Sequence, residues 1–302
     1  MSLSSRRARR RSEAAGGPVD RWTKLRRLRA VRSVEPMPGG SGSWLMQLED
    51  DSHCVVKFRD NPQGSRVLIN EWIGCRLAQR AGLPVAEPLQ VRVDEAVCEQ
   101  WPELRAPHVR PGLHFGSRTP VDPTTAAVYS EFPSALLAKV SNLDCALKTW
   151  AFDIWIGNID ERQVVFTREK KRSSTGKIYR VTLIDCGFAL GGPRWERVEG
   201  APPLRRWQRF AFRSGVAGRV SEAIDSLLEL RYEDLLATVE EIPEEWFCGL
   251  DEETRLRQQV LVDLEERRKR LRCLACRDHR PETCGDDIYR GLISFSARNC
   301  GG

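Results

Sequence analysis

Two oppositely charged side chains lie where their pairing would support catalysis. Lys57 is in an apolar, β-branched run over residues 55–58, and Glu71 is flanked by Ile69 and Trp72 in the segment that follows. A carboxylate on an apolar face is costly unless it is paired, and Lys57 is its natural partner. The alternative is a glutamate that points to water at the edge of a helix.

Two aspartates follow at positions that suit phosphate chemistry. Asp160 lies in a loop between an aromatic helix and a strand, and Asp185 ends an apolar strand beside a glycine. An aspartate of the second kind can bind Mg²⁺ that bridges nucleotide phosphates, while the first can accept a proton from an attacking hydroxyl. A turn-capping role explains either aspartate alone, but it does not explain the ordered set with the lysine and the glutamate.

A glycine-rich loop precedes these residues and consists of Gly39, Gly40, Ser41, Gly42 and Ser43. Three glycines in four positions let backbone N–H groups approach a polyphosphate without a Cβ clash. The loop is not a Walker A motif, because no Gly-Lys-Ser/Thr follows and the next element is a strand. Taken alone, it is equally an ordinary hairpin turn.

Apolar periodicity predicts the elements that position these groups. The runs 44–48 and 54–58, joined by a polar turn, predict a β-hairpin. A helix is predicted over about 66–81, because Gly82 and Pro84 end it. The other predicted elements are an extended segment at 31–36, a strand at 89–93, a loop at 108–125, helices at 125–140 and 142–156, strands at 164–166 and 179–184, and helices near 204–213, 221–239 and 251–274.

A change of character near residues 99–107, where two prolines occur, divides the chain into a small β-rich lobe and a larger helical one. The predicted division is a basic tail over 1–29, an N-lobe over 30–103, a C-lobe over 104–248 and a charged helix with a Cys-rich extension over 249–302.

The composition indicates a globular chain with a basic tail. Its 302 residues are 41% hydrophobic and 30% charged, which excludes a disulfide-stapled miniprotein and a disordered chain. No apolar run reaches the roughly 18 residues of a spanning helix, so we expect a soluble cytoplasmic protein without a membrane span. Residues 1–30 carry a charge of +8 and the remainder −2. We expect a solvated, disordered tail; weak contact with nucleic acid or acidic lipid is the alternative.

The C-terminal cysteines form a separate pattern. Cys273, Cys276, His279 and Cys284 offer four soft ligands within twelve residues that could hold Zn²⁺. The gap of two residues before the histidine is tighter than common zinc spacings. The alternative is a Cys pair that continues a charged helix.

Four stretches together resemble the HipA-like kinase domain family of bacteria, over about residues 30–248. The stretches are Val55-Val-Lys-Phe-Arg-Asp-Asn-Pro-Gln-Gly, Asn70-Glu71-Trp, Gly157-Asn-Ile-Asp160-Glu-Arg-Gln and Ile184-Asp-Cys-Gly-Phe-Ala. The resemblance implies an α+β fold of the protein-kinase type with two lobes, a small β-rich N-lobe with one helix and a larger helical C-lobe. It also implies ATP-dependent transfer of the γ-phosphoryl group to a hydroxyl, a serine or threonine of a protein being the family's acceptor.

The resemblance assigns a role to each motif. The loop at 39–43 would cover the phosphates, and Lys57 and Glu71 would form an ion pair that bridges the lobes. Asp160 would be the catalytic base, and Asp185 would bind Mg²⁺.

The resemblance also assigns the adenine hinge and contains one departure. Residues 97–101, with Glu99, would cradle the adenine. Relatives carry a metal-binding Asn five residues after the catalytic aspartate, where this chain has Val165. Asn158 or Gln163 could supply an oxygen instead. The alternative to an active kinase is a catalytically silent pseudokinase that acts as a nucleotide sensor or a protein-docking module.

Overall fold

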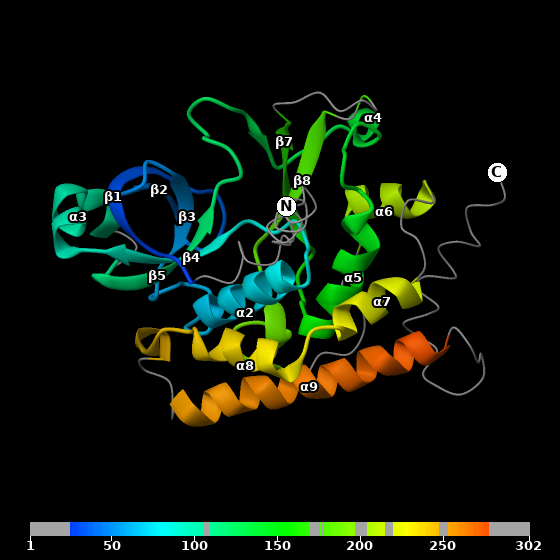
Figure 1. Ribbon diagram of the computed structural model, residues 1–302. Helices are drawn as coiled ribbons and strands as arrows, with labels where there is room; N and C mark the ends of the chain where they lie inside the picture. The colour runs from blue at the N-terminus through cyan, green and yellow to red at the C-terminus, as the bar shows by residue number, and fades with distance from the viewer. Residues whose placement is uncertain are drawn as a thin grey trace, which may run out of the picture.

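The computed structural model (Figure 1) describes residues 25–105, 109–169, 176, 178–196, 204–214, 220–247 and 253–277. Most of the predicted basic tail lies outside the described residues, and so do His279 and Cys284 of the predicted zinc site. No helix within the described ranges has the length and apolar character needed to cross a bilayer.

The first part of the chain forms a closed barrel with the strand order β1-β2-β3-β5-β4. Adjacent strands are antiparallel except β1 and β4, which are parallel. The pairing of β2 with β3 confirms the predicted hairpin. The strands of the barrel are β1 (Arg27–Pro36), β2 (Trp44–Leu48), β3 (His53–Lys57), β4 (Pro88–Val93) and β5 (Gly112–Arg118).

Helix α2 (Val67–Arg80) joins the barrel to the rest of the molecule. It packs against β5 on one side and α8 on another, and every residue from Val67 to Gln79 is buried. Gly82 follows with a φ of +72°, the left-handed conformation that commonly ends a helix. The predicted helix and its C-terminal signal are therefore confirmed.

The second part combines a small sheet of order β6-β7-β8 with a group of helices. Helix α9 runs along the lower edge of the molecule in Figure 1, against α5, α7 and α8. The elements are β6 (Val128–Tyr129), α4 (Ser134–Leu137), α5 (Cys145–Ile156), β7 (Gln163–Arg168), β8 (Tyr179–Ile184), α6 (Arg206–Arg213), α7 (Val220–Leu228), α8 (Tyr232–Glu240) and α9 (Glu253–Arg277).

Strand β5 corrects the predicted loop at 108–125 and the predicted boundary after residue 103. It lies between β3 and β4, so the barrel extends to Arg118. Its two glycines and Ser117 obscure the strand pattern. Gly116 is needed there, because a Cβ atom would lie 2.4 Å from Cγ2 of Val91 on the adjacent strand.

The predicted helix at 125–140 is also corrected. The segment contains only the short strand β6 and the single-turn helix α4. Pro133 precedes α4 in an extended conformation, with ψ of 132°. Because proline lacks the N–H of an interior helical residue, a helix cannot run through it without a break.

The predicted helix at 221–239 is divided into α7 and α8. Arg231 has an extended conformation between them, with φ of −89° and ψ of 165°. Its backbone N–H donates to Oδ2 of Asp234 at 2.8 Å, which caps the start of α8.

His114 in β5 makes the stability of the fold dependent on pH. Burial lowers the pKa of its imidazole to about 3, with a further contribution from the charge of Arg59. Nδ1 accepts the backbone N–H of Arg59 at 3.1 Å, which leaves the proton on Nε2, 3.0 Å from the carbonyl oxygen of Arg110. The folded state therefore holds a neutral imidazole.

We expect the free energy of unfolding to fall as the pH is lowered from 6.5, because the unfolded chain takes up a proton that buried His114 does not. The slope attributable to one group approaches about 1.4 kcal/mol per pH unit. Urea unfolding of the wild type and of His114→Gln between pH 7 and 5 measures it. The variant should show a flatter profile, and equal slopes in the two proteins would contradict the assignment.

Candidate active site

A buried lysine joins three elements. Nζ of Lys57, at the end of β3, lies 2.5 Å from Oε1 of Glu71 in α2 and 2.9 Å from Oδ1 of Asp185, which follows β8. Lys57 is 7% exposed and Glu71 1% exposed. The structure therefore brings together three of the charged residues singled out in the sequence.

The pKa directions follow from burial and from these contacts. Burial opposes the charge of Lys57, but the carboxylates of Glu71 and Asp185 raise the pKa of its ammonium. Burial raises the pKa of Glu71 to about 7, with Lys57 acting in the opposite direction. Burial also acts to raise the pKa of Asp185, but the ammonium of Lys57 holds it below its usual value. Asp185 therefore stays a carboxylate beside the lysine.

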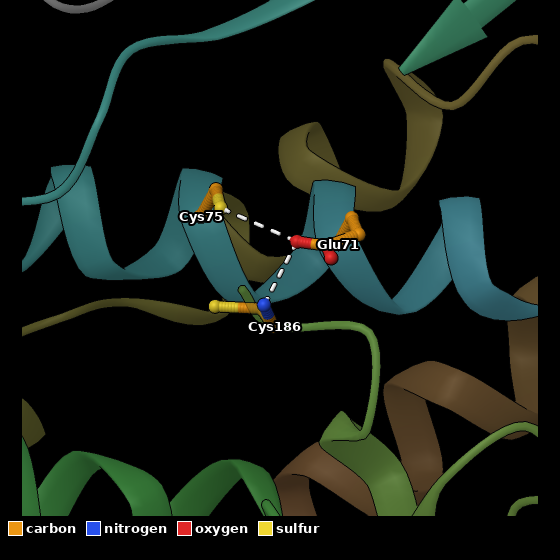
Figure 2. Close-up of side chains that lie close together, drawn as sticks. All are labelled: Glu71, Cys75 and Cys186. Carbon is orange, nitrogen blue, oxygen red and sulfur yellow. Dashed lines mark hydrogen bonds between the residues drawn. The ribbon is translucent and has the colours of Figure 1, made fainter. Parts of the chain in front are cut away.

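The second oxygen of Glu71 faces the chain that follows Asp185. Oε2 accepts the backbone N–H of Cys186 at 2.8 Å and lies 3.9 Å from Sγ of Cys75. Figure 2 shows both contacts as dashed lines. Helix α2 passes close to this segment at Gly74, where a Cβ atom would lie 2.4 Å from Cβ of Cys186. Glu71 is thus fixed by a cation on one side and by backbone on the other.

A second buried ion pair fixes the backbone at Asp185. Arg162, which is 2% exposed, pairs with Asp153 of α5. Its Nη1 donates to the carbonyl oxygens of Ile184 at 3.1 Å and Asp185 at 2.8 Å. These bonds hold Asp185 at a φ of +59°, a conformation that a non-glycine residue adopts only when its surroundings stabilise it.

The pair of Arg162 and Asp153 is not among the residues predicted from the sequence. A signal for it exists, because Asp153 lies between Phe152 and Ile154 in an apolar helix and needs a cation. The reasoning applied to Glu71 therefore also predicts a partner for Asp153.

The loop that carries Asp160 is bound to the segment after Asp185. The backbone N–H of Ile159 donates to the carbonyl oxygen of Phe188 at 3.1 Å, and that of Gly191 donates to Gly157 at 2.9 Å. The loop starts where Gly157 ends α5 with a φ of +60°. Strands β7 and β8 then pair directly after it.

The carboxylate of Asp160 is oriented by local bonds. Oδ1 accepts the backbone N–H of Glu161 at 2.8 Å, and Oδ2 lies 3.4 Å from Nε2 of Gln163. Gln163 pairs across the ladder with Ile184, the residue before Asp185. Gln163 therefore contacts Asp160 and lies opposite the residue that precedes Asp185.

The side chain of Asn158 makes hydrogen bonds at the start of the loop that carries Asp160. Its Oδ1 accepts the backbone N–H of Asp160, and its Nδ2 donates to Asp153, both at 3.3 Å. Val165 is buried and carries no ligand atom. Of the oxygen donors predicted for Mg²⁺, Asp185 and Gln163 fit that hard cation, whereas the amide of Asn158 already serves the loop.

The glycine-rich loop joins β1 to β2 at the same end of the barrel as Lys57, because Trp44 pairs with Val56. Gly39 and Gly42 have φ of +110° and +58°. Nδ2 of Asn61 donates to the carbonyl oxygen of Ser41 at 3.1 Å, and Oγ of Ser41 lies 3.1 Å from Oγ of Ser43. The loop is therefore held over the end of β3.

The structure does not bring Glu99 to this site. Residues 97–100 lie in α3 (Glu95–Gln100), which packs against β1 at the outer end of the barrel, and Glu99 is exposed. After α3 and η2 (Pro102–Arg105) the chain returns to the barrel as β5. The predicted hinge at 97–101 therefore lies in an excursion between two strands of the barrel, and it does not connect the barrel to the second part of the chain, which follows Arg118.

The predicted zinc site cannot be placed in the structure. His279 and Cys284 lie outside the described residues, and so do the side chains of Cys273 and Cys276. Within the described ranges, the three potential ligand atoms that lie within 4.8 Å of one another belong to Glu71, Cys75 and Cys186.

Comparison with known proteins supports a kinase-type fold. Residues 33–169 match the family described as HipA-like kinase. The resemblance to this family is confirmed over these residues. They include Lys57, Glu71 and Asp160, and they end before Asp185. No curated protein matches the chain.

Solved structures of kinases resemble the chain at low identity. The proinflammatory kinase CtkA of Helicobacter pylori is 12% identical, with a TM-score of 0.55 over 86% of this chain and 100% of that chain. A Golgi casein kinase with Mn/ADP bound is 10% identical, with a TM-score of 0.45 over 87% of this chain and 76% of that one. The first similarity shows a shared fold, and the second is too low to support an argument.

Gly74→Ala should destabilise the contact between α2 and Cys186. The added methyl group meets Cβ of Cys186, so backbone must shift, at a cost of about 1–3 kcal/mol in the free energy of unfolding. Urea unfolding measures this. The control is Gly40→Ala, because its nearest atom, Nε2 of Gln63, would lie 3.6 Å away. Equal stability of the two variants would contradict the close approach.

Proposed function

We propose that this chain is a phosphotransferase that moves the γ-phosphoryl group of ATP to a hydroxyl of a protein serine or threonine. One observation carries the proposal: Lys57 contacts both Glu71 and Asp185, within 2.5 and 2.9 Å. In kinases, an ion pair of this kind places the lysine on the nucleotide phosphates, next to the aspartate that holds the metal. The kinase-type family and fold support it.

The residues at the end of the barrel would bind the nucleotide. The ammonium of Lys57, held in place by Glu71, would meet the α- and β-phosphates. The backbone N–H groups of the loop at 39–43 would cover them. Mg²⁺ would neutralise charge that develops on the phosphates, and the oxygens of Asp185 and Gln163 would hold it.

Asp160 would act on the acceptor. Its carboxylate is oriented by the backbone N–H of Glu161 and by the amide of Gln163. An oriented carboxylate can accept the proton of the attacking hydroxyl as the oxygen–phosphorus bond forms and ADP leaves. The loop is fixed to the segment after Asp185, so acceptor and metal would share one site.

Val165 favours a second candidate function, that of a pseudokinase which binds nucleotide without turnover. The side chain at this position has no oxygen for a second metal, so activity depends on whether Gln163 supplies one. Nucleotide binding without product would support this second function.

Calorimetry with ATP and Mg²⁺ tests the nucleotide site. We expect metal-dependent binding by the wild type and a loss of at least tenfold in Asp185→Asn, about 1.4 kcal/mol, because the metal loses its carboxylate. Asp160→Asn should keep its affinity within twofold. The control Asp225→Asn changes an exposed carboxylate of α7. ATP affinity that changes neither with Mg²⁺ nor in Asp185→Asn would contradict the role of Asp185 as a metal ligand.

Turnover tests the base. ADP formation is measured with MgATP and a mixture of serine- and threonine-containing peptides. Asp160→Asn should reduce the rate by roughly 10²–10⁴-fold, the range of general-base catalysis. Full activity in this variant would contradict the role of Asp160. Binding of MgATP by the wild type without ADP formation would favour the pseudokinase.

A further inference from the structure

A cavity of about 770 Å³ opens beside the loop that carries Asp160. Glu161, Arg162 and Gln163, directly after that aspartate, line one side, together with Ile184. Helix α6 lines the opposite side. A group bound in this cavity would therefore lie next to the residues proposed to act on the acceptor.

The cavity is positively charged. Its charged lining residues are Arg162, Arg205, Arg206, Arg209, Arg213, Glu131 and Glu161. Arg162 is paired with Asp153 and Arg205 with Glu161, so the three arginines of α6 exceed the remaining Glu131 by two positive charges. A cationic cavity concentrates anions in its interior.

Three of the arginines recur on one face of α6. Arg206, Arg209 and Arg213 have the spacing i, i+3 and i+7, which places them on the side of the helix that lines the cavity. All three are exposed. Guanidinium groups form paired hydrogen bonds with carboxylates and phosphates, so this face suits anionic groups.

The spacing of these arginines is unfavourable for an isolated helix, although Nε of Arg209 donates to the carbonyl oxygen of Leu204 at 2.9 Å. Like charges at these spacings repel one another. Arg206 adds positive charge at the N-terminal end, where the helix dipole favours acids, and α6 has no acid in its first turn. An anion in the cavity would offset both effects.

Apolar side chains line the remaining wall. Phe132, Trp207 and Phe210 face the cavity, and Phe132 stacks on the ring of Phe166 with centroids 4.3 Å apart. The cavity therefore suits a segment that carries apolar side chains as well as negative charge.

An ion pair connects this surface to the catalytic loop. Nε of Arg205, the residue before α6, lies 2.7 Å from Oε2 of Glu161, the neighbour of Asp160. This contact joins the start of α6 to the neighbour of the proposed base.

We propose that this cavity binds an anionic segment of the acceptor peptide, with glutamate, aspartate or phosphoserine beside the hydroxyl that receives the phosphoryl group. The identification of the bound segment as the acceptor rests on the proposed function, but the binding itself needs no nucleotide. Carboxylate and phosphate share the chemistry that arginine recognises, and the test separates them.

Fluorescence anisotropy of labelled peptides on the full chain, without ATP, tests the proposal. The probes are a serine flanked by glutamates and one leucine, the same peptide with glutamines, and a third with phosphoserines in place of the glutamates. We expect the glutamate or phosphoserine peptide to bind at least tenfold more tightly than the glutamine peptide, with an affinity that falls as salt rises. The tighter of the two anionic peptides identifies the anion.

The double variant Arg206→Gln/Arg209→Gln should lose at least tenfold in this affinity. Arg255→Gln, an exposed arginine of α9 outside the cavity, should bind as the wild type does. Anisotropy that is equal for anionic and glutamine peptides, or unchanged in the double variant, overturns the proposal.

Kinetics separate this proposal from the proposed function. With MgATP and the preferred peptide, the double variant should raise KM and leave kcat unchanged, because the arginines bind the acceptor and do not react. Peptide binding in a chain that fails to bind MgATP would refute the phosphotransferase and retain the anion site. MgATP turnover with no preference for anionic peptides would retain the phosphotransferase and refute the anion site.

Discussion

The buried ammonium of Lys57 is the interaction on which the arrangement of the site depends. Removing a charged group from water costs several kcal/mol, which is recovered only with well-placed partners. Glu71 and Asp185 come from a helix and from a loop distant in sequence. The barrel, α2 and the end of β8 must therefore assemble together. Loss of one partner would leave a buried charge unpaired, at about 3–5 kcal/mol.

The pair of Arg162 and Asp153 extends this constraint into the helical part. Arg162 holds the carbonyl oxygens on either side of the turn at Asp185, and Asp153 shares a hydrogen bond with Asn158 at the start of the Asp160 loop. One buried cation thus sets the position of both loops. The two ion pairs are linked through Asp185, whose side chain contacts Lys57 and whose backbone contacts Arg162.

Much of this could be predicted from local pattern. The hairpin, α2 and its glycine end follow from apolar periodicity, and the need of Glu71 for a partner follows from its apolar neighbours. The place where the chain leaves the barrel for the second part could not be predicted. Helices α3 and η2 interrupt the barrel between β4 and β5, and the sequence does not show that a chain returns to an earlier sheet. Strand β5 was obscured because Gly116 is required by the close approach of Val91. The cationic cavity depends on tertiary contacts between α6 and the Asp160 loop, which no local pattern contains.

We propose that Lys57 and Asp185 act as one unit on a metal–nucleotide complex. A double-mutant cycle on MgATP affinity, with Lys57→Met, Asp185→Asn and the double variant, tests this most directly. We predict that the double variant loses much less affinity than the sum of the single losses, with a coupling energy of about 0.5–3 kcal/mol, as for residues in direct contact. Additive losses, or a wild type that binds no MgATP, would contradict the claim.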